Sequence, residues 1–298
     1  MTLEGATMGT RWRILVSAPH GSDMRAVERA IAARLAGLVA EMSHWDDTSL
    51  LCRFNRAPPG TWFSLPPDFA SVIARALLIA GLSDGAFDPS LGALVDLWGF
   101  GPPGPQPVPI DLAIADARDR CGWERLAWDA SRQSLRQPGR LSLDLSGIAK
   151  GYAADTITDL LMAHGLRHAL VEVGGELAGR GIRPDGEPWW VDLENPPGLD
   201  LPPLRIALHG IAVATSGRYV RGDHNIDPRT GRPPANDVIA ASVVATSATD
   251  ADAWASALVV LGASAGLALA TRHHIAARLV LDDGAERLSP ALHAMLAD

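Results

Sequence analysis

A series of short apolar runs in the second half of the chain limits the possible folds more than any other feature. These runs are rich in Val, Leu and Ile, as β-strands are, and they occupy residues 141–145, 168–173, 189–194, 204–208, 211–214 and 238–245. Gly174-Gly175 and His209-Gly210 lie between consecutive runs, where a tight reversal would pair the strands antiparallel. The pattern predicts an α+β fold with mostly antiparallel sheets and flanking helices, not a doubly wound parallel sheet.

Other segments carry the patterns of helices. Residues 23–42 have apolar side chains at spacings of three and four, which indicates an amphipathic helix. Residues 67–82 begin with Pro, which is favoured in a first helical turn. Ser247, with Asp250 three residues later, forms a capping box at the start of another helix. The helix after Ser247 is predicted over about 248–270. Further helices are predicted over about 152–163 and near 110–120, and an opening strand is predicted over 10–17.

The segment from Gly99 to Pro109 is dense in Pro and Gly and is predicted to be an ordered loop. It contains Gly99, Gly101 and Gly104 at the spacing of a dinucleotide-binding fingerprint, but a helix cannot open at a run of prolines, so we reject that interpretation. We predict one domain over residues 1–298, and if it is divided into two lobes we expect them to meet near residues 101–109.

Charge and hydropathy exclude several kinds of partner. The chain has 34 acidic and 26 basic residues and a net charge of -8, so we expect no binding to nucleic acid. The longest apolar runs, 73–82 and 257–270, are interrupted by Arg, Gly or Ser and are shorter than the roughly 18 residues that cross a bilayer, so no membrane-spanning segment is expected. The first residues show no signal peptide. We therefore expect a cytoplasmic protein, or a periplasmic one if a signal was removed.

Cys52 and Cys121 are the two cysteines of the chain. Two thiols are too few for a disulfide framework, and their spacing is not that of a zinc site. We interpret both as ordinary, partly buried thiols.

The stretch from Leu141 to Asp155 is the most informative about chemistry. A strand is predicted to end at Leu145, and a loop with two glycines and Lys150 leads directly into a helix. Backbone N–H groups at a helix N-terminus and a nearby ammonium group favour a bound phosphate. A plain strand-to-helix turn with a solvated lysine explains the same spacing equally well.

A second polar stretch, Ala214 to Pro234, lies between two predicted strands and contains His224 and Asp227. A neutral imidazole accepts a hydroxyl proton near pH 7, so His224 could be a general base with an orienting acid nearby. A surface histidine beside an Asp-Pro turn is the alternative.

Asp252 and Ser256 are four residues apart, and so they share one face of the predicted helix 248–270. The rest of that face is apolar, and a buried carboxylate needs a partner. A hard cation such as Mg²⁺, which takes oxygen ligands, would be one. The alternative is that Asp252 only stabilises the helix dipole from the first turn.

Aromatic residues accompany two further polar stretches. Trp98 and Phe100 follow the Asp88-Pro89 turn, and Trp45 lies in the comparable stretch 42–55. An aromatic ring beside a polar loop can stack on a planar ligand, although each ring taken singly is more often part of the core.

Together these stretches resemble the ApbE family, the FAD:protein FMN transferases, also called flavin transferases. The resemblance extends over nearly the whole chain, through residues 8–10, 42–55, 84–101, 143–155, 174–176, 214–221, 224–233 and 252–256. It implies an ApbE-like fold, cleavage of FAD with Mg²⁺, and attachment of FMN through a phosphoester to a threonine of a partner flavoprotein, with release of AMP.

The resemblance also implies the site residues. Those expected to line the FAD site are Met8, Trp45, Ala86, Phe87, Asp88, Ser146, Lys150, Tyr152 and His224. Mg²⁺ would be held by Asp252, Ser256 and the Ala149 carbonyl. The roles fit the residue types, because Lys150 can neutralise phosphate charge and His224 can take the proton of the threonine as the catalytic base.

Three positions depart from the family pattern. Ser256 stands where Thr is usual, Trp45 where Tyr is common, and Asn225 where Ile is usual. The first two keep the hydroxyl group and the aromatic face, whereas Asn225 places a polar group in the lining of the flavin pocket. Two other functions use the same residues: an FAD pyrophosphatase that releases FMN and AMP to water, and a flavin-binding protein without activity. Retention of Asp252, Ser256 and His224 argues against the inactive protein.

Overall fold

The computed structural model describes residues 1–220 and 222–297. Among these residues, an eight-stranded sheet forms the centre of the fold, in the order β1-β2-β6-β7-β10-β11-β12-β13. Its strands are β1 (Thr2–Thr7), β2 (Thr10–Ser17), β6 (His168–Val173), β7 (Glu176–Arg180), β10 (Ala212–Gly217), β11 (Val238–Ala245), β12 (Ala276–Leu281) and β13 (Glu286–Leu288). Every neighbouring pair is antiparallel, which confirms the predicted α+β class.

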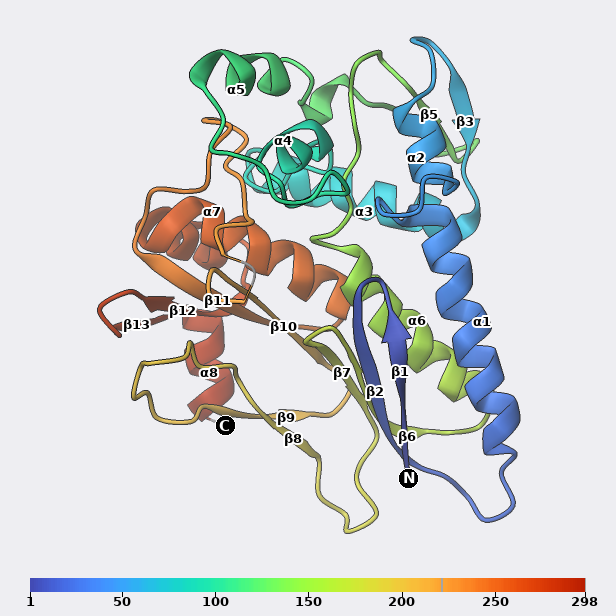
Figure 1. The fold of residues 1–298 in the computed structure, drawn as a ribbon. Coiled ribbons are helices and arrows are strands. Elements are labelled where there is room, and N and C mark those ends of the chain that lie inside the picture. The colour runs from blue at the N-terminus through green and yellow to red at the C-terminus, as the bar shows by residue number, and fades with distance from the viewer. Residues whose placement is uncertain (221, 298) are drawn as a thin grey trace.

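Helices cover one face of this sheet more heavily than the other (Figure 1). α6 (Ala149–Ala163) and α7 (Ala248–Arg272) lie on one face, and α1 (Met24–Met42) packs against α6. α8 (Pro290–Ala297) and the hairpin of β8 (Trp189–Asp192) and β9 (Arg205–Leu208) lie on the opposite face. The main hydrophobic core fills the space between the sheet and the helices of the first face.

The remaining elements gather at one end of the molecule, beyond the N-terminal end of α6 (Figure 1). They are α2 (Leu50–Asn55), α3 (Pro67–Leu82), α4 (Gly92–Leu97), α5 (Asp111–Arg118), the short 3₁₀ helix Trp123–Arg125, and a small sheet of β3 (Trp62–Ser64), β5 (Ser134–Arg136) and β4 (Ala127–Asp129). Residues 99–109 connect α4 to α5 without helix or strand, which confirms the predicted loop. A division into two lobes at this loop stays a prediction.

Several predicted elements are confirmed nearly to the residue. The helix predicted over 23–42 is α1, and Asp23 caps it by accepting a hydrogen bond from the Ala26 N–H. Ser247 caps α7 by accepting from the Asp250 N–H, while the Asp250 carboxylate pairs with Arg75 of α3. Cys52 and Cys121 are free thiols, and burial raises the pKa of Cys121 to about 12, so it is unreactive at neutral pH.

The strand predicted over 141–145 is wrong. In the structure this segment makes an isolated bridge between Ser142 and Leu91. Its other backbone groups are taken by side chains and loops: Asn55 binds both the N–H and the carbonyl of Leu143, and the Asp144 N–H donates to the Pro89 carbonyl. The apolar residues of the run are buried, but the polar backbone groups are satisfied without a strand ladder.

Two further expectations need correction. His209-Gly210 turns the chain, but it does not join a hairpin, because β9 pairs with β8 whereas β10 pairs with β7 and β11. The second correction concerns α6. This helix was expected to begin near residue 152, but it begins at Ala149. Lys150 therefore belongs to the first turn of α6 rather than to the preceding loop.

α7 is longer than predicted. It runs over 25 residues and is broken at Gly262, whose φ of 76° is not helical. Its most apolar 18-residue window has a mean hydropathy of 1.8, so by length and composition this helix could cross a membrane, and 61% of that window is buried inside the fold. Such burial is also what the core helix of a globular domain shows, and the expectation of no membrane-spanning segment stays a prediction.

Gly151 lets α6 and α7 approach each other closely. A Cβ at this position would lie far inside contact distance of the Ala248 carbonyl oxygen, a backbone atom that cannot move aside. We expect Gly151→Ala to lower the free energy of unfolding by about 1 to 3 kcal/mol, the usual cost of overpacking. Urea denaturation measures this change.

Gly37 provides the control for that experiment. It is an exposed glycine inside α1, and a Cβ there would meet no atom within 4 Å. Gly37→Ala should therefore raise stability, by about 0.5 to 1 kcal/mol, because alanine is the better helix former. Equal effects of the two substitutions would contradict the close approach of α6 to α7.

Candidate active site

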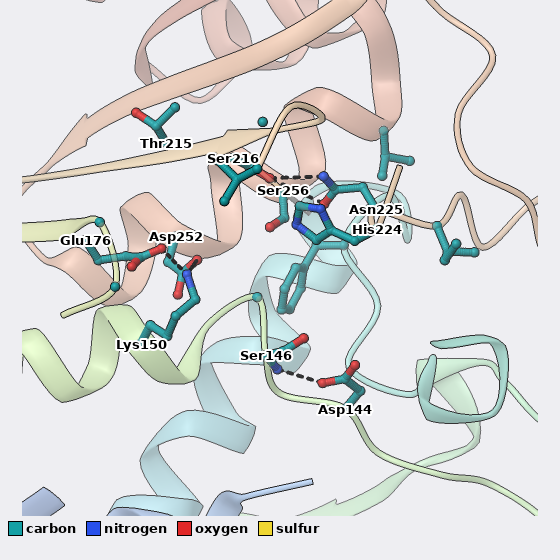
Figure 2. A pocket seen from close by; sticks show the side chains of 18 of the residues that line it. Asp144, Ser146, Lys150, Glu176, Thr215, Ser216, His224, Asn225, Asp252 and Ser256 are labelled. Carbon is teal, nitrogen blue, oxygen red and sulfur yellow. Dashed lines mark hydrogen bonds and ion pairs between the residues drawn. The ribbon is translucent and has the colours of Figure 1, made fainter. Parts of the chain in front are cut away.

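A cavity of about 230 Å³ opens where the central sheet meets the N-terminal end of α6 and the first turns of α7 (Figure 2). Its lining comes from segments far apart in the sequence. The described lining residues include Thr10, Ala86, Phe87, Asp88, Asp144, Ser146, Gly147, Lys150, Gly174, Glu176, Glu194, Thr215, Ser216, Tyr219, His224, Asn225, Asp252 and Ser256.

The sheet itself makes room for this cavity. β7 and β10 pair at only two positions, Ala178 with Ala212 and Leu177 with Val213, and β10 then continues alone on this side to Gly217. β7 itself begins at Glu176, directly after the β6–β7 turn at Gly174-Gly175. Thr215 and Ser216 therefore extend past the last β7–β10 pair and line the opening.

Three charged side chains form the centre of the site. The Lys150 ammonium donates a hydrogen bond to Glu176 Oε1, and its Nζ lies 3.9 Å from Asp252 Oδ1. Figure 2 shows Lys150 reaching between the two carboxylates from α6, with Glu176 at the start of β7 and Asp252 on α7. Lys150 passes close to Gly174, where a Cβ would stand 3.2 Å from Lys150 Cδ and would crowd the side chain.

Burial changes the pKa values of the two carboxylates in this group. Burial raises the pKa of Glu176, the Lys150 ammonium lowers it, and the neighbouring Asp252 carboxylate raises it further. Burial also raises the pKa of Asp252, against the opposing effects of Lys150 and of the Gly151 N–H, which donates to Asp252 Oδ2 over 3.0 Å. Two buried carboxylates share one ammonium group, so the cluster attracts a further positive charge.

The segment from Asp144 to Lys150 also lines the cavity. The Ser146 N–H donates to Asp144 Oδ1 over 2.7 Å, which folds the loop back on itself before α6 begins. Ser256 of α7 lies against this loop, since a Cβ added to Gly147 would be 3.1 Å from Ser256 Oγ. The loop and the first turns of α6 and α7 thus bring Ser146, Lys150, Asp252 and Ser256 together at one cavity.

His224 faces the cavity from the segment that follows β10. Its Nδ1 lies 3.1 Å from the Gly222 carbonyl oxygen, and its ring meets the edge of Phe100 at a centroid distance of 6.4 Å. The carboxylate proposed to orient it, Asp227, uses both of its oxygens to accept hydrogen bonds from Arg229. Asn225, the departure from the family pattern, is buried and exchanges hydrogen bonds with Ser216.

Ala86, Phe87 and Asp88 also line the cavity. The Asp88 carboxylate accepts hydrogen bonds from the N–H and the hydroxyl of Ser90, and burial raises its pKa. Asp88 therefore holds the turn that carries Phe87, in addition to any contact it makes with a ligand.

Four predicted site residues lie outside the described lining of the cavity. Met8 forms the β1–β2 turn with a φ of 48°, and Ala149 is buried at the start of α6 between lining residues. The Tyr152 hydroxyl donates to Asp68 of α3 over 2.7 Å, and Arg34 of α1 pairs with the same carboxylate. Trp45 is 64% exposed in the loop after α1.

Sequence reasoning missed Glu176 as a site residue. An acidic residue that shares the buried face of β7 with Ala178 needs a charged partner, and this alternation was visible in the sequence. Thr10, Asp144, Glu194 and Tyr219 also line the cavity. No pattern in the sequence singles them out, because their positions depend on how distant segments pack.

The residues at this site fit a magnesium ion. Glu176 Oε2 is buried and accepts no hydrogen bond from any described residue, so it can accept a further positive group. No cluster of three His, Cys, Asp or Glu side chains in the described residues could enclose a metal. Mg²⁺, however, is usually held by one or two carboxylates together with water and substrate phosphates, and Asp252 and Ser256 supply hard oxygen atoms of that kind.

Comparison with known proteins gives consistent matches over most of the chain. The model of the ApbE family matches residues 8–279. The chain is 35% identical over 295 residues to the FAD:protein FMN transferase of Vibrio cholerae serotype O1, which covers 95% of this chain and 88% of that protein.

Solved structures show the same fold. The crystal structure of the Pseudomonas stutzeri flavinyl transferase ApbE in its apo form matches with a TM-score of 0.93 and 33% identity, over 100% of this chain and 97% of that one. The flavin transferase ApbE from Vibrio cholerae matches with a TM-score of 0.91 and 34% identity, over 99% of this chain and 98% of that one.

Proposed function

The chain belongs to the ApbE family, and from this we propose that it is an FAD:protein FMN transferase. It splits FAD with the help of Mg²⁺, attaches FMN to a threonine of an acceptor flavoprotein, and releases AMP. The observation that carries the proposal is the group of Lys150, Glu176 and Asp252 in a cavity that His224 also faces. A pyrophosphate and a cation would be held on one side of such a cavity and a base on the other.

The first role of the chain is to hold the pyrophosphate. Lys150 projects from the first turn of α6, and the Ser146 segment lies beside it. An ammonium group at a helix N-terminus stabilises the negative charge of phosphate oxygens. Asp252, Ser256 and the Ala149 carbonyl would hold Mg²⁺. When bound, Mg²⁺ would neutralise further charge on the phosphate oxygens.

The second role is to activate the acceptor. The threonine oxygen attacks the phosphorus atom of the FMN half, a new P–O bond forms, and the bond to the oxygen of AMP breaks. His224 takes the proton that the threonine hydroxyl loses, and AMP leaves with the electron pair of the broken bond. A neutral imidazole is suited to this proton transfer near pH 7.

Mass spectrometry of an acceptor flavoprotein, incubated with FAD, Mg²⁺ and the enzyme, tests the proposed function. The expected result is a mass gain equal to one FMN on a threonine, with an equal amount of AMP in solution. Free FMN and AMP with an unmodified acceptor would instead indicate a pyrophosphatase. Unchanged FAD would indicate a flavin-binding protein without activity.

Trp45 allows a test of where the flavin lies. Its ring is exposed, so it is free to stack on a planar ligand that extends out of the cavity. We expect FAD to quench tryptophan fluorescence and Trp45→Ala to weaken FAD binding by about 1 to 3 kcal/mol, the usual worth of one stacked ring. Trp62 of β3, which is 53% exposed, is the matched control, and Trp62→Ala should leave the dissociation constant unchanged. An unchanged dissociation constant for Trp45→Ala would place the flavin elsewhere.

A further inference from the structure

The carboxylate of Asp155 binds the start of α7 from the neighbouring helix α6. Its Oδ1 accepts a hydrogen bond from the Ala248 N–H over 2.8 Å. Its Oδ2 accepts from the Thr249 N–H over 2.9 Å and from the Thr249 hydroxyl over 2.6 Å. N–H groups in a first helical turn have no partner inside their own helix, so this carboxylate satisfies two of them and complements the helix dipole.

A second contact runs in the opposite direction between the same helices. Asp252 lies one turn after Ala248 on α7, and its Oδ2 accepts from the Gly151 N–H in the first turn of α6. Asp155 lies one turn after Gly151 on α6. Each helix therefore provides a carboxylate that binds the N-terminal turn of the other, and the missing side chain of Gly151 permits this close packing.

This pair of contacts lies beside the site residues. Asp252 and Ser256 belong to the first turns of α7, whereas Lys150 belongs to the first turn of α6, and Figure 2 shows Asp252 beside Lys150. A slide of α7 along α6 would separate these side chains. Asp252 belongs to the described lining of the cavity, whereas Asp155 does not. Asp155 would therefore not touch a ligand bound in the cavity.

We propose that Asp155 is a positioning residue, which fixes the first turn of α7 on α6 and thereby holds Asp252 and Ser256 opposite Lys150. This inference rests on the proposed function. Groups that orient metal ligands in this way usually contribute about 10-fold to 100-fold to metal affinity or activity.

Asp155→Asn tests the inference, because the amide has the same shape but presents an N–H group to donors. Mn²⁺ is the probe, and its binding to the free protein is followed by electron paramagnetic resonance without FAD. We expect the Mn²⁺ dissociation constant to rise about 10-fold or more. With FAD and acceptor, the Mg²⁺ concentration for half-maximal transfer should rise by a similar factor, while the KM for FAD changes by less than about 3-fold.

Asp250→Asn is the matched control. Asp250 lies in the same first turn of α7, but its carboxylate pairs with Arg75 of α3 and does not line the described cavity. This variant also loses an interaction of the first turn of α7, and it should bind Mn²⁺ as the parent does. If Asp155→Asn does not fold, Thr249→Val removes one of the three bonds and should weaken Mn²⁺ binding, whereas Thr249→Ser keeps the hydroxyl and should restore it.

The outcomes separate the two proposals. Parent-like Mn²⁺ binding by Asp155→Asn, or by Thr249→Val where the first variant does not fold, overturns the positioning role. An equal loss of Mn²⁺ binding in Asp250→Asn also overturns the positioning role, because the weaker binding would then result from lower stability alone. If the parent protein itself neither binds Mn²⁺ nor consumes FAD, the proposed function fails, and the inference that rests on it fails with it.

Discussion

Asp252→Ala should abolish FAD cleavage while the protein remains folded. Asp252 is the carboxylate of α7 that lies beside Lys150 and accepts the Gly151 N–H, and it is 5% exposed. Without it, the proposed Mg²⁺ site loses its only predicted carboxylate ligand. We expect a loss in rate of at least about 10²-fold to 10³-fold, as when one charge-stabilising group is removed from an active site.

Several measurements distinguish this loss from unfolding. The circular dichroism spectrum of Asp252→Ala should match that of the parent, because removing one repelling carboxylate from a buried pair offsets part of the lost hydrogen bond. The loss of Asp252 should also lower the pKa of Glu176, since Asp252 raises it in the parent. Full cleavage activity of the variant in chelator-treated buffer would refute the metal site.

His224→Ala should separate FAD binding from group transfer. A threonine hydroxyl is a poor nucleophile at neutral pH, so the base matters for the transfer step more than for holding FAD. We expect the rate of FMN transfer to fall by about 10²-fold to 10⁴-fold, the usual contribution of a positioned base, with FAD affinity within about 3-fold of the parent. The transfer rate of the parent should also fall at acid pH, because a protonated imidazole cannot accept the threonine proton.

His209→Ala is the control for this experiment. His209 is an exposed histidine in the turn after β9, where its Nδ1 lies 2.9 Å from the Gly181 carbonyl oxygen, and it does not line the described cavity. Its substitution should change neither binding nor rate. If His224→Ala transfers FMN normally but binds FAD poorly, His224 is a ligand contact, and the base must be sought among the carboxylates of the cavity.

Local sequence signals predicted the elements whose stability is mostly local. α1, α3 and β11 lie within a residue of their predicted bounds, because periodicity and capping residues act over a few neighbouring positions. β12 and β13 were missed, and the run 141–145 was wrongly predicted to be a strand. Its backbone partners, Asn55 and Pro89, lie far away in the sequence, and no window of neighbouring residues reveals them.

In the candidate site, too, local sequence signals identified some residues, and contacts between distant segments decided others. Asp252 and Ser256 were grouped from their spacing on one helix, and Lys150 was singled out by its place beside a helix start; all three line the same cavity. Glu176 was left out, although the fold places it against Lys150. Tyr152 was assigned to the FAD site, and in the fold its hydroxyl group donates to Asp68, which also pairs with Arg34.

By itself, the sequence determined the α+β class, the tight reversal at Gly174-Gly175, and the kinds of side chain available for phosphate, metal and proton chemistry. These follow from alternation, turn residues and functional groups, which are properties of short segments. The tertiary structure decided which groups meet: Lys150 with Glu176 and Asp252, and Asp155 with the start of α7. Such contacts join residues 26 to 102 positions apart, and only the packing of α6 on α7 and on the sheet, with burial strengthening each charge interaction, brings them within reach.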